Sequence, residues 1–433
     1  MLKRLIIFMV LSPVVWGQYE QAYTNKPVPY SSTILIPRAA IPQAGIVPQA
    51  TAVEIPVAGV PQPPVSSGPA SLNSPFRPAA GIPHPTTADV ARRRVQVVAP
   101  PLPVLTPVTQ IPLPANVAAP VPTAKPLPAI DAPILFNTPR ADAILATLQV
   151  FPSNNTWHAD ISQWPVHPRS TDIISTVGAW RPLECNQDMG FVIAPKNAPR
   201  ASVKIAPYAT ESDPGPYPLP ENLPIEGWPV FYQRSMQFNL LTLDDVQRDV
   251  RNLGGDRHAI VVDPSDQKLY EFYSMRKTKQ GWQAAQASIF DLSANKLRPD
   301  GWTSADAAGL PIFPAVVRYD ELVRGEIDHA LRVTVLQSRK AYVAPATHYA
   351  SKLADENLPR MGERFRLRQS YNIASFSPEV QTILKALKKH GMFVADNGGI
   401  VAISVTPDER IRNVLTELNR VTVADFEIVT APR

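Results

Sequence analysis

The sequence predicts an α+β fold, mainly antiparallel β and sandwich-like with a few packed helices, preceded by a disordered proline-rich arm. Three observations indicate this fold. Of the 49 prolines, 27 precede Ala141, so the two parts of the chain differ sharply in composition. Beyond Ala141, short apolar runs alternate with turn residues, which is typical of antiparallel strands. Two segments near the end of the sequence have the apolar periodicity of amphipathic helices.

The first residues, 1–17, have the pattern of a secretory signal peptide. Lys3 and Arg4 precede an apolar run from Leu5 to Val15, and Gly17 supplies a small residue for cleavage. The apolar run is too short for a membrane span, which needs about 20 residues, and no later stretch reaches that length. We therefore expect a secreted or cell-surface protein without a transmembrane segment. An N-terminal membrane anchor is the alternative.

Residues 18–140 form the proline-rich arm. Proline fixes φ and lacks an N–H donor, so such a segment favours extended polyproline II or a disordered linker and builds no core. The cluster Arg92–Arg94 in this arm is either a solvated charge run or a processing site.

Residues 141–433 are expected to form a single β-rich globular domain. GFVIAP and ASVKIAP predict two short strands around a turn at Lys196 and Asn197. A short helix is predicted to begin after the cap residue Thr242 and to end at Gly254 and Gly255. The next three apolar segments, at 258–263, 268–277 and 281–292, predict an antiparallel meander.

The last hundred residues show the strongest local signals. Ser377 and Pro378 begin a predicted helix that ends at Gly391. Two apolar runs then flank Asp396–Gly399, which predicts a hairpin. A second helix is predicted to start at Thr406, and a strand follows at 426–429.

The central stretch from Gly301 to Tyr349 concentrates the side chains capable of chemistry. We predict that Asp306, His329 and His348 are catalytic and that Trp302, Arg332, Tyr342 and His258 bind ligand. Each has a structural alternative, because an acid in a turn often caps backbone and a histidine is often a satisfied core residue. His258 is either positioned by Asp256 or begins a strand with its ring in solvent.

Other kinds of site find little support. No nucleophile elbow, HExxH motif or phosphate-binding glycine loop is present, and the seven histidines lack metal-ligand spacing. The single cysteine, Cys185, excludes an intrachain disulfide and a CxxC zinc site. We therefore expect no metal and no cofactor. The net charge of +5 is scattered rather than clustered, so no nucleic-acid partner is expected. Asn154 begins an N-x-T sequon, which predicts a surface glycan in a eukaryotic source.

Several motifs resemble a family of uncharacterised secreted proteins, seen mainly in bacteria. They are GWTSADAAGLPIFP at 301–314, RYDE at 318–321, GxIxHALR at 325–332, AYVxPAxH at 341–348, MGxRFRL at 361–367 and ADNG at 395–398. The similarity extends from about Val150 to Phe426 and leaves out the proline-rich arm. It implies one secreted domain; the family has no established activity, so no catalytic residue is transferred.

Two functions are compatible with these features. The first is a polysaccharide-binding or polysaccharide-active protein, with an extracellular glycan or cell-wall component held in a groove near Trp302 and His329. The export signal and the aromatic, acidic and histidine-bearing segments favour it. The second is a non-enzymatic matrix or cell-surface protein in which the proline-rich arm serves as a spacer.

Overall fold

The computed structural model describes residues 127–433, apart from 235–240, 412 and 433. The predicted signal peptide, nearly all of the proline-rich arm and the cluster Arg92–Arg94 lie outside the described residues. Among the described residues, the first regular element begins at Ile134, a few residues ahead of the change in composition at Ala141.

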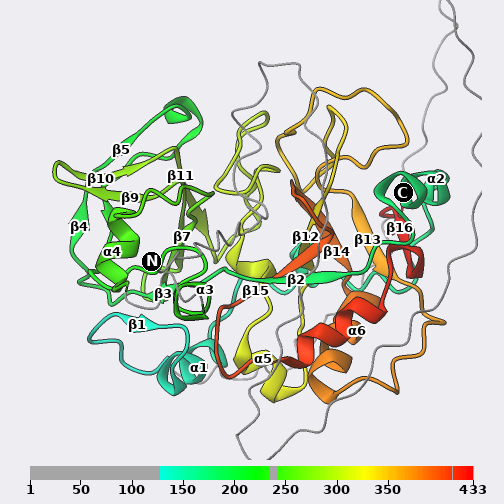
Figure 1. The fold of residues 1–433 in the computed structure, drawn as a ribbon, viewed down its shortest axis with the longest axis horizontal. Coiled ribbons are helices and arrows are strands. Elements are labelled where there is room, and N and C mark those ends of the chain that lie inside the picture. Colours follow the sequence, from blue (N-terminus) through cyan, green and yellow to red (C-terminus); the bar gives the residue numbers. More distant parts are fainter. Residues whose placement is uncertain (1–126, 235–240, 412, 433) are drawn as a thin grey trace, which may run out of the picture. The chain divides into compact units, whose positions relative to one another are not determined.

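Two sheets organise the described part of the chain, and they occupy opposite halves of the view in Figure 1. The five-stranded sheet has the order β1 (Ile134–Leu135), β3 (Val192–Ile193), β7 (Ala259–Asp263), β8 (Lys268–Tyr273), β11 (Gln286–Asp291). The six-stranded sheet has the order β16 (Phe426–Val429), β13 (Arg364–Leu367), β14 (Met392–Asn397), β12 (Leu331–Val335), β15 (Ala402–Val405), β2 (Glu184–Gln187).

Smaller elements surround these sheets. Two short sheets consist of β5 (Val203–Ile205), β10 (Gly281–Ala284) and β9 (Arg276–Thr278), and of β4 (Arg200–Ala201) and β6 (Tyr217–Pro218). The α-helices are α1 (Pro139–Leu145), α2 (Ser170–Val177), α3 (Val230–Arg234), α4 (Leu243–Arg248), α5 (Tyr319–Arg324) and α6 (Pro378–Lys389). The 3-10 helices are η1 (Thr156–His158), η2 (Ala209–Glu211), η3 (Phe313–Ala315), η4 (Asn413–Arg420) and η5 (Val423–Asp425).

The prediction of a β-rich α+β fold is confirmed. Among the described strands, eight pairs are antiparallel and four are parallel. The parallel pairs make the sheets mixed, which short hairpin connections alone could not produce because parallel neighbours need a crossover.

The five-stranded sheet is buried on both faces. Along β7, Ile260 and Val262 enter the core that also contains the six-stranded sheet, whereas Ala259 and Val261 enter a second core on the other face. Successive side chains of a strand point to opposite faces, so burial on both sides requires an unbroken apolar run. This explains why the sequence AIVVD does not alternate.

The predicted meander is confirmed in its outline. β7, β8 and β11 are neighbours and pair antiparallel, while β9 and β10 form a separate hairpin that β5 joins in parallel. The two strands predicted around Lys196 and Asn197 do exist, as β3 and β5, but they belong to different sheets.

The predicted first residues of two helices, α4 and α6, are confirmed. α4 begins after Thr242, whose side chain accepts from the backbone N–H of Asp245, and α6 begins at Pro378 directly after Ser377. The predicted end of α4 at Gly254 is wrong, because Asp249 already adopts a left-handed conformation with φ 52°. The helix predicted to start at Thr406 is also wrong in place and type, since the segment is the 3-10 helix Asn413–Arg420.

The predicted hairpin around Asp396–Gly399 is wrong. β12 inserts between the two expected partners, running parallel to β14 and antiparallel to β15. The connection after Asn397 therefore passes over the end of β12, where the backbone N–H of Gly398 donates to the carbonyl of Val335. Both β14 and β15 are interior strands as a result, and Asp396 lies in a strand rather than in a turn.

Gly309 provides a test of the packing in the central stretch. Its φ is +74°, and an added Cβ would lie 2.1 Å from Thr347 Oγ1 and 2.6 Å from the carbonyl oxygen of Trp302. We expect Gly309→Ala to lower the free energy of unfolding by about 3 kcal/mol, because left-handed strain and overpacking add. Urea denaturation measures this change.

Gly301→Ala is the matched control, because Gly301 has φ +79° but open space around the added Cβ. It should cost only the strain, about 1–2 kcal/mol. Equal losses for the two variants would contradict tight packing at Gly309.

Candidate functional site

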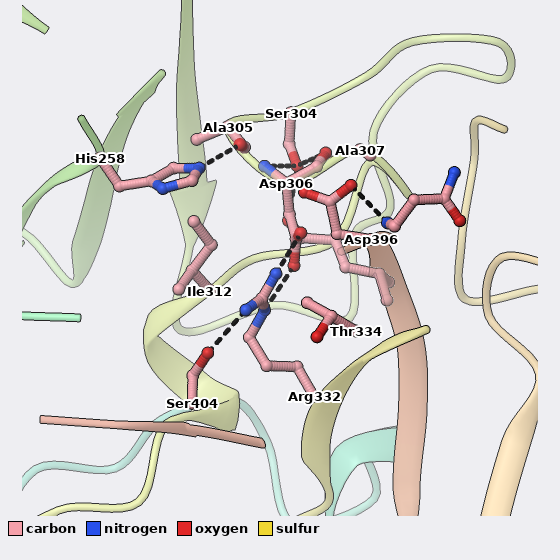
Figure 2. A network of polar contacts seen from close by, with 12 residues as sticks. His258, Ser304, Ala305, Asp306, Ala307, Ile312, Arg332, Thr334, Asp396 and Ser404 are labelled. Carbon is pink, nitrogen blue, oxygen red and sulfur yellow. Dashed lines mark hydrogen bonds and ion pairs between the residues drawn. The ribbon is translucent and has the colours of Figure 1, made fainter. Parts of the chain in front are cut away.

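A buried ion pair lies at the centre of the candidate site. Arg332, on β12, donates to both carboxylate oxygens of Asp306, from Nε at 2.9 Å and from Nη2 at 2.6 Å. Its remaining Nη1 donates to Ser404 Oγ on β15 at 2.6 Å (Figure 2). Both charged side chains are almost completely buried. Every carboxylate oxygen of Asp306 is thus occupied by the fork of one guanidinium, which is the strongest geometry for such a pair.

A second buried charge pair, His258 and Glu226, contacts the central stretch at Ala305, next to Asp306. The ring of His258 contacts Glu226 Oε2 through Nδ1 at 2.9 Å and the carbonyl oxygen of Ala305 through Nε2 at 2.9 Å. The carbonyl oxygen can only accept, so Nε2 donates to it, and with an ionised Glu226 accepting from Nδ1 the imidazole is protonated. Burial opposes that charge, but the charge and hydrogen bond of Glu226 outweigh it and raise the pKa of His258 to about 10.

Three further carboxylates surround these pairs and stay partly exposed: Asp188, Asp256 and Asp396. Burial, together with the neighbouring charge of Glu226, raises the pKa of Asp188 to about 8 and that of Asp256 to about 6. Burial and the neighbouring charges of Asp306 and Asp256 raise the pKa of Asp396 to about 8. Carboxylates therefore outnumber the cations that could neutralise them, which favours protonated acids at neutral pH.

Two cavities meet at this carboxylate cluster. The smaller, of about 300 Å³, is lined by Asp188, Glu226, His258 and Arg332. The larger, of about 630 Å³, is lined mainly by aromatic and small residues. Asp256 and Asp396 line both cavities, so a ligand in either one reaches the same two carboxylates.

The predicted catalytic residues do not meet in one cavity. His348 lines the larger cavity, where its Nδ1 contacts the carbonyl oxygen of Ala307. His329 lines another cavity, of about 500 Å³, and its Nε2 bonds to Glu321 at 2.7 Å. Asp306 is sealed in its ion pair with Arg332, although it lies beside Asp396 (Figure 2).

The predicted ligand-binding residues divide in the same way. His258 and Arg332 line the smaller cavity, each already paired with a carboxylate. Tyr342 stacks on Tyr349 with 6.3 Å between ring centroids and donates to Asp300, outside the cavity wall. Trp302 lies beneath the guanidinium of Arg298. The predicted glycosylation residue Asn154 is exposed, and its Oδ1 accepts from Asn295.

Sequence reasoning missed the two carboxylates shared by the cavities. The run Asp396–Gly399 is typical of hairpins and so predicts a turn at Asp396, and the sequence suggests Asp256 only as a partner for His258. In the structure Glu226 holds His258 instead, and the ring is buried rather than solvated. The available signal is the position of these acids directly before or at the end of apolar runs, which places them near the ends of strands.

One cluster has the spacing of metal ligands among the described residues, namely Glu321, Asp328 and His329. Glu321 already binds His329 and the guanidinium of Arg318. The acids of the two cavities do not converge closely enough to form such a cluster.

Comparison with known proteins gives no relative: no family model, curated protein or solved structure matches the chain. The resemblance to secreted bacterial proteins stays a prediction. Within residues 127–433, apart from the gaps given above, none of the helices has the length and apolar character needed to cross a bilayer.

The ion pair can be tested by removing one partner or both. Asp306→Ala should lower the free energy of unfolding by about 3–5 kcal/mol, since it leaves a buried guanidinium unpaired. The double variant Asp306→Leu/Arg332→Met should lose less, because no charge is left unpaired. Chemical denaturation measures both; Arg140→Ala, which breaks the exposed pair with Asp131, is the control and should change little. A double variant less stable than the single one would contradict this account.

The raised pKa values also predict how stability depends on pH. Asp188 and Asp396 have a pKa of about 8 and His258 of about 10, all above their ordinary values. The folded chain therefore binds more protons than the unfolded chain between about pH 4 and 10, so stability falls as pH rises through this window. Urea midpoints at pH 5, 6.5 and 8 should decrease in that order. Asp396→Asn should flatten the decrease between pH 5 and 8; an unchanged slope would be inconsistent with its raised pKa.

Proposed function

We propose that the folded domain cleaves a polysaccharide by general acid–base catalysis, with Asp396 and Asp256 as the catalytic pair. The observation that carries the proposal is geometric: these two carboxylates are the acids common to two adjoining cavities. A substrate lying across the junction would present its linkage to both. Hydrolysis of a glycosidic bond needs such a pair on either side of the bond.

The environments of the two acids support different roles. Burial and the charges of Asp306 and Asp256 raise the pKa of Asp396 to about 8, so this acid is protonated at neutral pH and can donate to the leaving oxygen. The pKa of Asp256 is about 6, so it is ionised at neutral pH. It can activate a water for attack on the anomeric carbon, or attack that carbon itself. Two carboxylates with separated pKa values are the usual arrangement for such a division.

The neighbouring pairs act on the catalytic acids without reaching the substrate bond. Asp306 lies beside Asp396, and its charge favours the protonated form of that acid (Figure 2). The protonated His258 favours ionisation of Asp256. Both pairs are held by several hydrogen bonds, so these charges are fixed before substrate arrives, as electrostatic preorganisation requires.

The predicted export signal supports an extracellular substrate, and a glycan or cell-wall component is the partner class proposed. Compared with the groove expected near Trp302 and His329, the proposed site is displaced to the junction of the two cavities. Of the residues predicted to be catalytic, His348 lines the proposed site, in the wall of the larger cavity. We propose no nucleic-acid partner and no cofactor for this reaction.

The proposal is tested with the full chain on a broad panel of polysaccharides, by release of reducing ends. Asp396→Asn and Asp256→Asn should each lower kcat/KM by about 10²–10⁴, because each removes a proton-transfer group. The wild-type profile of kcat/KM against pH should be bell-shaped, with limbs near pH 6 and pH 8 set by the pKa values of Asp256 and Asp396.

Asp172→Asn is the control, because Asp172 is an exposed acid on α2. It should leave the rate unchanged. Absence of turnover and of binding across the panel would remove the proposal and favour a non-enzymatic surface protein. Equal effects of all three substitutions would remove the assignment of the catalytic pair.

A further inference from the structure

The larger cavity is lined by aromatic residues that come from two parts of the fold. Tyr273, from β8, and Tyr208 belong to the region of the five-stranded sheet, while His348 and Tyr349 come from the long connection between β12 and β13. Small residues of the central stretch, Thr303, Ser304, Ala305 and Ala307, also line it. Aromatic faces bind apolar CH surfaces, and the hydroxyl groups beside them bind polar edges. A sugar ring presents both.

The rings of the long connection are arranged as an ordered row. His348 and Tyr349 are parallel within 1°, with 5.5 Å between their centroids, and Tyr342 continues the row at 6.3 Å and 17°. The row is anchored at both ends, by His348 Nδ1 on the carbonyl of Ala307 and by the Tyr342 hydroxyl on Asp300. Because these contacts already fix the rings, binding to them costs little side-chain entropy.

The smaller cavity continues beyond the catalytic acids and has a different lining. Side-chain amides of Asn186, Gln187 and Asn397 and the backbone of Gly398 and Gly399 line it. These groups donate and accept hydrogen bonds without charge. The two catalytic acids therefore have binding space on both sides, aromatic on one and amide-rich on the other.

The charges of the site disfavour a polyanionic ligand. Asp256 and Asp396 line both cavities, and Asp188 lines the smaller one, whose cations His258 and Arg332 are already paired with Glu226 and Asp306. Lys352 is the cation on the wall of the larger cavity. A carboxylated or sulfated chain in the smaller cavity would meet the ionised Asp256, and it would find there only cations that carboxylates already hold.

From these observations we infer that the substrate is an uncharged glycan chain that crosses both cavities, with one sugar ring against Tyr349, and that it is cleaved internally. The inference rests on the proposed function and adds the substrate class and the position of cleavage. An internal bond is cut because sugar units are bound on both sides of Asp256 and Asp396. Tyr342, which stacks on Tyr349, provides a further aromatic surface that binds sugar units outside the cavity.

The test uses the full chain and end-labelled oligosaccharides of two to eight units from neutral glucans, xylans and mannans, with a polyuronate series of equal lengths. We expect internal products from the longer neutral chains, slow turnover of disaccharides and no turnover of the polyuronates. Tyr349→Ala should raise KM for a hexasaccharide about tenfold, which corresponds to one lost stacking contact, and should leave kcat nearly unchanged. Tyr349→Phe should retain the wild-type KM.

Trp180→Ala is the control, since Trp180 is an exposed aromatic, 73 % accessible, on the connection between α2 and β2. Release of monosaccharides from one chain end, preference for polyuronates, or equal KM values for Tyr349→Ala and Trp180→Ala would each overturn the inference and leave the proposed function standing. Absence of turnover on every glycan would overturn both.

Discussion

The described structure depends on one segment, from Trp302 to Val317, that is bound to both large sheets. On the side of the five-stranded sheet, His258 donates to the carbonyl of Ala305, and the buried Glu271 accepts from the backbone of Ile312 and Phe313. On the other side, Arg332 holds Asp306, and the backbone of the segment bonds to β14 and β15. Each contact is buried, so its loss would leave an unpaired polar group, which costs far more than an exposed contact does.

The same contacts explain why the site carries an excess of acids. Asp306 and Glu226 already pair with the nearby cations Arg332 and His258, so these cations compensate Asp188, Asp256 and Asp396 only in part. Their raised pKa values follow from burial and from the like charges around them. The polar interior that joins the sheets is therefore also the source of the proton-donating groups. The proposed function would use for proton transfer the same charges that stabilise the fold.

Much of the secondary structure, and less of the site, could be predicted from the sequence. The cap of α4, the start of α6 at Pro378 and the apolar runs of β7, β8 and β11 are local signals, and these predictions hold, although the Ser377 side chain makes no capping hydrogen bond. The insertion of β12 between β14 and β15 is a long-range pairing, which no local pattern contains. The cluster of acids is missed for the same reason, because Asp188, Asp256 and Asp396 come from distant segments that only the sheets bring together.

The connectivity of the two sheets has a consequence for folding during synthesis. All strands of the five-stranded sheet have been made once residue 291 has left the ribosome, whereas β2, at 184–187, pairs only with β15, at 402–405. β2 thus has no strand partner while more than half of the domain is translated. Unpaired strands can pair with other chains and aggregate. The sequence of β2, Glu-Cys-Asn-Gln, is polar and lacks the apolar pattern that drives strand aggregation. This composition reduces the risk of aggregation before β15 has been synthesised.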